Sequence, residues 1–82
     1  MKAKAKTIFD PRYKAFIAEL VVLRKSKDLT QRELAKLFNQ PHGFIGRVEI
    51  RERRLDLIEA IDLLKAMGLS KAEIVKVIEK IL

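Results

Sequence analysis

Residues 29–56 read LTQRELAKLFNQPHGFIGRVEIRERRLD, and this segment contains the signals of two short helices separated by a tight turn. Thr30 and Glu33 have the spacing of a capping box, which predicts a helix over residues 31–38. Asn-Gln-Pro at 39–41 interrupts the helical pattern, because a proline disfavours α conformation in the residue before it. Apolar residues at helical spacing resume in residues 42–49, so we expect a second short helix after a turn of about three residues.

Three further helices are predicted on either side of this segment. Asp10 followed by Pro11 is an N-cap with proline at the first helical position, which predicts a helix from Pro11 to about residues 25–27. Two more capping-box spacings predict helices over 57–67, closed by Gly68, and over 71–82. No stretch alternates with period two long enough to indicate a strand, so the expected fold class is all-α with five helices.

Length and composition limit the classes of protein and of site. Eighty-two residues form one small domain, assigned to residues 8–82 after a flexible basic arm over residues 1–7 that contains Lys2, Lys4 and Lys6. The chain has no cysteine and one histidine, so disulfides, a zinc site and the usual parts of a nucleophilic enzyme are missing. We therefore expect neither enzyme activity nor a metal or other cofactor. Its apolar runs are too short to span a membrane, which predicts a cytoplasmic protein.

The positive charge is concentrated in the first two thirds of the chain. Eighteen basic and 11 acidic residues give a net charge of +7. Residues 1–54 carry 14 basic and 6 acidic side chains, whereas residues 55–82 carry 4 and 5. A basic half of this kind indicates a polyanionic partner, most often nucleic acid.

Several motifs resemble those of one family of DNA-binding domains. They are Leu-Thr-Gln at 29–31, Leu34 with Ala35, Glu49 at the end of the second short helix, and Glu-Arg-Arg-Leu-Asp at 52–56. Over about residues 13–70 the chain is similar to the lambda-repressor or Cro-like helix-turn-helix family, often called XRE-type regulators. The resemblance implies a lambda-repressor-like fold that binds duplex DNA, with helix 42–49 in the major groove, which is about 12 Å wide. It also implies a sequence-specific transcriptional regulator, most simply a repressor, and therefore a cytoplasmic protein associated with the nucleoid.

The resemblance further implies which residues contact DNA. The expected base-contacting residues are His42, Gly43, Gly46 and Arg47. Arg47 is the best base reader among them, because arginine bonds guanine through two hydrogen bonds. The expected phosphate-contacting residues are Gln31, Arg24, Arg51, Arg53 and Arg54. Gln31 stands at a helix start, where exposed amides favour an anion. Arg24 is also expected to pair with Glu49, the alternative being an ordinary surface ion pair.

Three residues depart from the family pattern. Gly43 and Gly46 stand where the family commonly has polar side chains, and glycine lowers helix stability by roughly 0.8–1 kcal/mol relative to alanine. They indicate either a close approach of the backbone to DNA or relaxed specificity, and both interpretations stay open. Arg51 stands where the family usually has a left-handed glycine, so we expect either a strained residue or a longer recognition helix.

The last helix has more apolar residues than one buried face needs. We expect a homodimer interface formed by Ile74, Ile78, Ile81 and Leu82, the alternative being a well-buried terminal helix. Such a dimer would place two recognition helices about 34 Å apart. Two other functions remain open at this point. One is the antitoxin of a toxin-antitoxin pair, with a toxin as partner. The other is a protein-interaction module that no longer recognises DNA bases.

Overall fold

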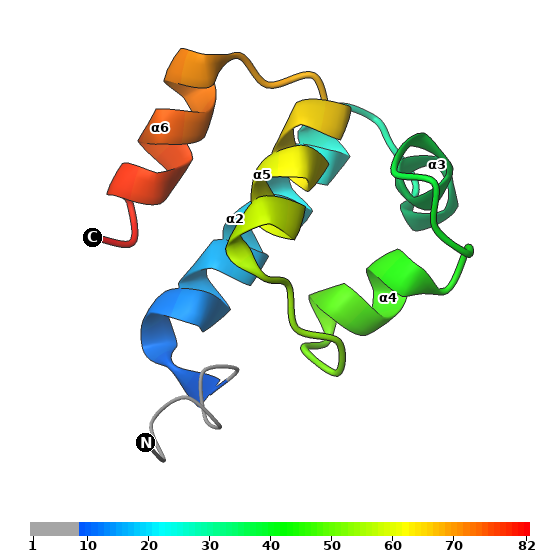
Figure 1. Ribbon diagram of the computed structural model, residues 1–82, viewed down its shortest axis with the longest axis horizontal. Coiled ribbons are helices and arrows are strands. Elements are labelled where there is room, and N and C mark those ends of the chain that lie inside the picture. Colours follow the sequence, from blue (N-terminus) through cyan, green and yellow to red (C-terminus); the bar gives the residue numbers. More distant parts are fainter. Residues whose placement is uncertain (1–8) are drawn as a thin grey trace.

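The structure is a computed structural model and describes residues 9–82. That part of the chain contains five α-helices and no strand, which confirms the all-α prediction (Figure 1). The helices are α2 (Pro11–Ser26), α3 (Gln31–Leu37), α4 (Phe44–Glu49), α5 (Leu57–Ala66) and α6 (Lys71–Glu79). The expected basic arm, residues 1–7, lies outside the described residues.

Four helices begin at the N-caps that the sequence predicts. In α3 the Glu33 N–H donates to Thr30 Oγ1 at 3.0 Å, and the Thr30 N–H donates to Glu33 Oε1 at 2.8 Å. The same reciprocal bonds begin α5 and α6. At the start of α2, Asp10 accepts hydrogen bonds from the side chain and the backbone N–H of Arg12, and together these bonds lower the pKa of Asp10 to about 2. Each cap satisfies backbone groups that a helix end leaves without a partner.

Four helices end with a residue in the left-handed region. These residues are Asp28, Asn39, Arg51 and Gly68, with φ between 57° and 88°. After each one the next N–H bonds back to a carbonyl five residues earlier, as in Glu52 N to Arg47 O at 2.9 Å. Gly68 was predicted as a helix end of this kind, and Arg51 confirms the strained residue that was one of the two expectations there. The left-handed conformations of Asp28 and Asn39 were not predicted. Aspartate and asparagine tolerate the left-handed conformation better than arginine does, so Arg51 is the strained member of the set.

Two predicted helix boundaries were wrong by more than one residue. The second helix of the central pair begins at Phe44 and not at His42, and six residues, 38–43, connect it to α3 instead of about three. Its N-cap, Gly43, has no side chain with which to bond the first turn, and the Phe44 N–H instead closes a turn on Pro41 O at 3.0 Å. The last helix ends at Glu79, because the final N–H groups bond carbonyls three residues back.

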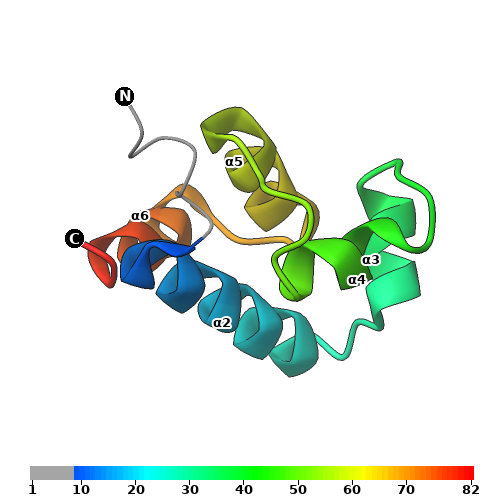
Figure 2. The same ribbon diagram turned by 90° about the horizontal axis from the view of Figure 1, so that it is seen from below.

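The five helices pack around one core, and the molecule has two distinct ends. In both views α6 lies at one end of the longest axis, which measures 36 Å, and α3 and α4 lie at the other (Figures 1 and 2). α4 packs against α2 and α3, and α6 packs against α2 and α5. The largest fully buried side chains are Ile17, Ile45, Val48, Leu63 and Leu64. In the described part of the chain no helix has the length and apolar character needed to cross a membrane.

Candidate nucleic-acid interface

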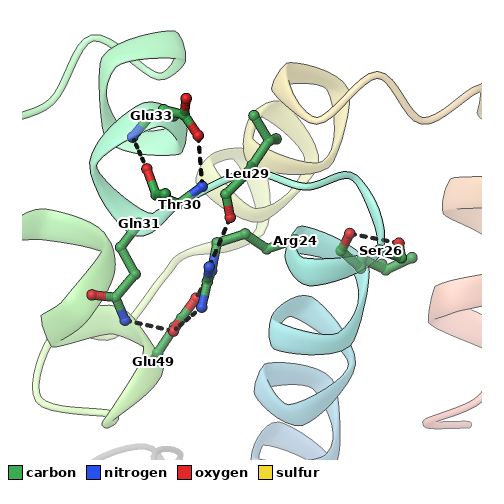
Figure 3. A network of polar contacts seen from close by, with 8 residues as sticks. Arg24, Ser26, Leu29, Thr30, Gln31, Glu33 and Glu49 are labelled. Carbon is green, nitrogen blue, oxygen red and sulfur yellow. Dashed lines mark hydrogen bonds and ion pairs between the residues drawn. The ribbon is translucent and has the colours of Figure 1, made fainter.

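A polar network joins the three helices at the α3–α4 end of the molecule (Figure 3). Arg24 of α2 donates from Nε to Glu49 Oε2 at 2.7 Å and from Nη2 to Glu49 Oε1 at 3.2 Å. Its third donor, Nη1, bonds the carbonyl oxygen of Leu29 at 2.8 Å. Gln31, the first residue of α3, donates from Nε2 to Glu49 Oε1 at 2.8 Å. Glu49, the last residue of α4, therefore holds both α2 and α3.

The predicted Arg24–Glu49 pair is present, and it is buried. The two side chains are 9% and 10% exposed, so the alternative of an ordinary surface pair does not apply. Buried pairs of this kind are costly to break from one side, because the remaining charge loses its partner. The Arg24 guanidinium faces into the molecule, whereas Gln31 is exposed. The network fixes the position of α4 relative to the rest of the domain.

The outward side of α4 has only one long polar side chain. Phe44, Ile45 and Val48 are buried, so they turn one face of α4 into the core. Arg47 is exposed on the opposite side, and no hydrogen bond or ion pair within residues 9–82 engages its side chain. His42 is exposed but lies in the turn before the helix. The four residues expected to contact bases thus divide between the turn, with His42 and Gly43, and the helix, with Gly46 and Arg47.

Neither glycine at this surface is required by the fold. Gly43 has φ −81° and ψ −6°, a conformation open to any residue. A Cβ atom at Gly43 would lie 3.5 Å from Arg47 Nη1, and one at Gly46 would lie 3.4 Å from Gln31 Oε1. Both distances are ordinary van der Waals contacts. Packing within the domain does not account for the two glycines, so an explanation in terms of DNA approach or of relaxed specificity still stands for both.

Hydrogen bonds from Arg53 hold the segment between α4 and α5 in place. Its Nη1 and Nη2 atoms donate to Glu59 Oε1 at 3.1 Å and to Glu59 Oε2 at 2.7 Å, and Nη1 also bonds the carbonyl of Arg54. The Arg53 guanidinium carbon lies 5.2 Å from the centroid of the Phe44 ring, within cation–π range. Hydrogen bonds from Arg53 and from the Asp56 N–H lower the pKa of Glu59.

The comparisons with known proteins agree with this geometry. A family model described as Helix-turn-helix matches residues 22–74, which is 53 of the 82 residues and runs from α2 into α6. The chain belongs to the XRE-type, lambda-repressor-like helix-turn-helix family. It is a DNA-binding regulatory domain, and the family is not typically enzymatic. The search of curated proteins finds no match, and the search of solved structures finds none.

In this helix-turn-helix domain the residues expected to contact phosphate occupy different settings. Gln31 and Arg54 are exposed and Arg51 is half-buried, whereas the guanidinium groups of Arg24 and Arg53 are bonded to carboxylates. The bonds between Arg53 and Glu59 were not predicted from the sequence. The two residues are six positions apart across a loop and a helix start, so no helical spacing relates them. The position of the Phe44 ring under the Arg53 guanidinium was likewise not predicted.

The residues expected at the dimer interface lie on and after α6. Ile74, Ile78 and Ile81 are half-buried and pack against the core of the helix-turn-helix domain, and Leu82 is 94% exposed. Among residues 9–82 no group of three histidine, cysteine, aspartate or glutamate side chains is arranged to hold a metal ion.

Proposed function

We propose that this domain is a transcriptional repressor that reads a specific duplex DNA site by inserting α4 into the major groove. The observation that carries the proposal is the exposed Arg47 on the outward side of a helix that Glu49 fastens to α2 and α3. An arginine on a helix that is held in place can recognise guanine through two hydrogen bonds to O6 and N7. Blocking access of the polymerase to the bound site is the simplest regulatory consequence.

The proposed contacts follow the exposure of the side chains. Arg47 reads a base, and the turn residues His42 and Gly43 together with Gly46 approach the groove. Because Arg47 is the one long polar side chain on the outward side of α4, we expect few direct hydrogen bonds to bases. Phosphates are bound by Gln31 at the start of α3 and by Arg51 and Arg54 in the segment after α4. Arg24 and Arg53, whose donors bond Glu49 and Glu59, act by holding these elements in position.

Selection of the protein against a random duplex DNA library at about 150 mM salt tests this proposal, because non-specific attraction is weak there. We expect one enriched motif that contains a guanine. The Arg47→Ala variant should lose about ten- to a hundredfold in affinity for that motif, which corresponds to about 1–3 kcal/mol for one base contact. Lys76→Ala, which removes an exposed charge from α6, is the matched control. If Arg47→Ala binds the same motif equally well, the domain is better assigned as a protein-interaction module.

The salt dependence of binding counts the phosphates that are neutralised. If all four arginines expected to contact phosphate did so, the log-log slope would be about −3.6 per subunit, at about −0.9 per neutralised phosphate. The carboxylates of Glu49 and Glu59 already pair with Arg24 and Arg53, and Gln31 carries no charge. We therefore expect two neutralised phosphates and a slope of about −1.8 per subunit. A slope nearer −3.6 would mean that Arg24 and Arg53 leave their carboxylate partners when DNA binds.

We propose that the repressor is a homodimer joined through the end of α6, where Leu82 is exposed beside the half-buried Ile78 and Ile81. Half-sites one turn apart, about 34 Å, require each α4 to lie about 17 Å from the two-fold axis. α6 lies at the opposite end of the 36 Å long axis from α4, so we expect a larger half-site spacing. A one-turn spacing would instead indicate a dimer through a face nearer α4, such as the exposed Leu57 and Ile58. Sedimentation of Leu82→Lys, which should be monomeric, tests the interface itself.

A further inference from the structure

A groove of about 350 Å³ lies between α5 and α6, away from the proposed DNA-binding surface. Its lining residues are Ile61, Lys65, Leu69, Lys71, Ile74 and Val75. Leu69 is buried, Ile61 and Ile74 are half-buried, and Val75 is 47% exposed. The groove therefore has an apolar lining that water reaches, with no acidic side chain among the six.

The two lysines stand at one end of the groove, where α5 passes into α6. Lys65 is in the last turn of α5 and Lys71 is the first residue of α6. Both are exposed, and neither makes an ion pair with another residue of the described range 9–82. Lys71 also stands at the positive end of the α6 dipole, where a cation is unfavourable. The position of Lys71 therefore does not serve the stability of α6, and a negative charge placed near it would be favourable.

The groove also stays accessible when the opposite end of the domain is engaged. α6 lies at the far end of the long axis from α3 and α4 in both views (Figures 1 and 2). Binding at the groove and binding of DNA at α4 are therefore sterically independent.

We propose that this groove binds an acidic amphipathic helix of another protein. Apolar side chains at helical spacing on that helix would enter the groove between α5 and α6, and its carboxylates would meet Lys65 and Lys71. Docking of an amphipathic helix in an apolar groove is a general mode of peptide recognition, and charge complementarity selects among partners. A second copy of this chain is a poorer occupant, because its net charge of +7 adds like charge to the two lysines. The proposal goes beyond DNA binding and does not depend on it.

The experiment uses the full chain and a synthetic helical peptide with leucines along one face and glutamates beside them. Titration followed by NMR of the labelled protein should show saturable binding, with the largest shift changes at Ile61, Ile74 and Val75. A control peptide of the same composition, scrambled so that the leucines no longer share a face, should not bind. Absence of saturable binding by the first peptide, or shift changes confined to α3 and α4, would overturn the proposal.

Charge reversal tests the role of the lysines. The double variant Lys65→Glu, Lys71→Glu should bind the glutamate peptide about tenfold more weakly, and a peptide with lysines in place of the glutamates should recover that binding. Lys76→Glu, a reversal on α6 outside the groove, is the matched control and should bind the glutamate peptide as the unmodified chain does. Equal binding by the double variant and the unmodified chain would refute the assignment of the lysines.

Two further measurements distinguish other occupants. If the free chain sediments as a dimer that the peptide dissociates, the groove holds a second copy and the proposal fails. If the chain binds vesicles of anionic lipid and the double variant does not, the partner is a membrane surface and the proposal likewise fails. DNA binding by the double variant should be unchanged, so a failure of the groove proposal is distinguishable from a failure of the proposed DNA-binding function.

Discussion

Replacing Arg51 by glycine should stabilise the protein and weaken its binding to DNA. Arg51 has φ 63° and follows the last residues of α4, with its N–H bonded to Val48 O at 3.0 Å. The bonds that end α4 thus require the left-handed conformation at this position. In that conformation the Cβ atom of an L-residue crowds a neighbouring carbonyl oxygen, which costs roughly 1–2 kcal/mol. Glycine has no Cβ and removes the crowding.

The net gain in stability is smaller than this cost, because a glycine loses more conformational entropy on folding than an arginine does. That loss amounts to roughly 0.5–1 kcal/mol. We therefore expect Arg51→Gly to raise the free energy of unfolding by about 0.5–1 kcal/mol. For a domain of this size about 1 kcal/mol corresponds to a shift in Tm of roughly 4–8 °C. Thermal unfolding followed by circular dichroism resolves a change of this size.

Arg51→Ala is the control that separates conformation from charge. Both variants lose the same positive charge, but alanine retains the Cβ atom and with it the crowding. Arg51→Gly should therefore unfold at a higher temperature than Arg51→Ala, while both show a salt slope of DNA binding that is shallower by about 0.9. A Tm for Arg51→Gly equal to or below that of Arg51→Ala would refute the reasoning from the left-handed conformation.

Three further predictions concern the caps and the recognition helix. Glu49→Ala leaves the buried Arg24 without its carboxylate and should lower the free energy of unfolding by about 3 kcal/mol in urea titration, whereas the exposed Glu52→Ala should change it by less than about 0.5 kcal/mol. Gly46→Ala should raise stability by up to about 1 kcal/mol, because a Cβ fits there, and a loss of DNA affinity in the same variant would favour close backbone approach over relaxed specificity. Asp10 has a pKa near 2 in the folded protein and an ordinary value of 3.8, so its ionised form stabilises the fold above about pH 4 and this contribution is lost as the pH falls toward 2. Between pH 4 and pH 2 the urea unfolding midpoint of Asp10→Asn should therefore change less than that of the unmodified chain. If the two midpoints change equally with pH, the stabilising role of the Asp10 carboxylate is contradicted.

The starts of α2, α3, α5 and α6 were determined by the sequence alone, whereas α4, which has no side-chain cap, begins two residues later than predicted. Each N-cap acts on N–H groups two or three residues ahead, so the chemistry lies within one turn and is visible as the spacing of Thr30 with Glu33, or of Ser70 with Glu73. The family motifs around residues 29–56 likewise lie within one short stretch, and they correctly indicated the helix-turn-helix fold. Local signals of this kind do not require knowledge of the rest of the chain.

Most of the contacts of the candidate site were decided by the tertiary structure. The residue type of Arg51 does not indicate a left-handed conformation, and the family pattern offered a strained residue there only as one of two expectations. Glu49 contacts residues 25 and 18 positions away, in α2 and α3, and it becomes their common partner only when three helices pack together. The stacking of Arg53 on Phe44 arises in the same way. Local backbone chemistry therefore determined where four of the helices begin, and contacts between distant residues determined which polar side chains are held within the domain and which remain exposed.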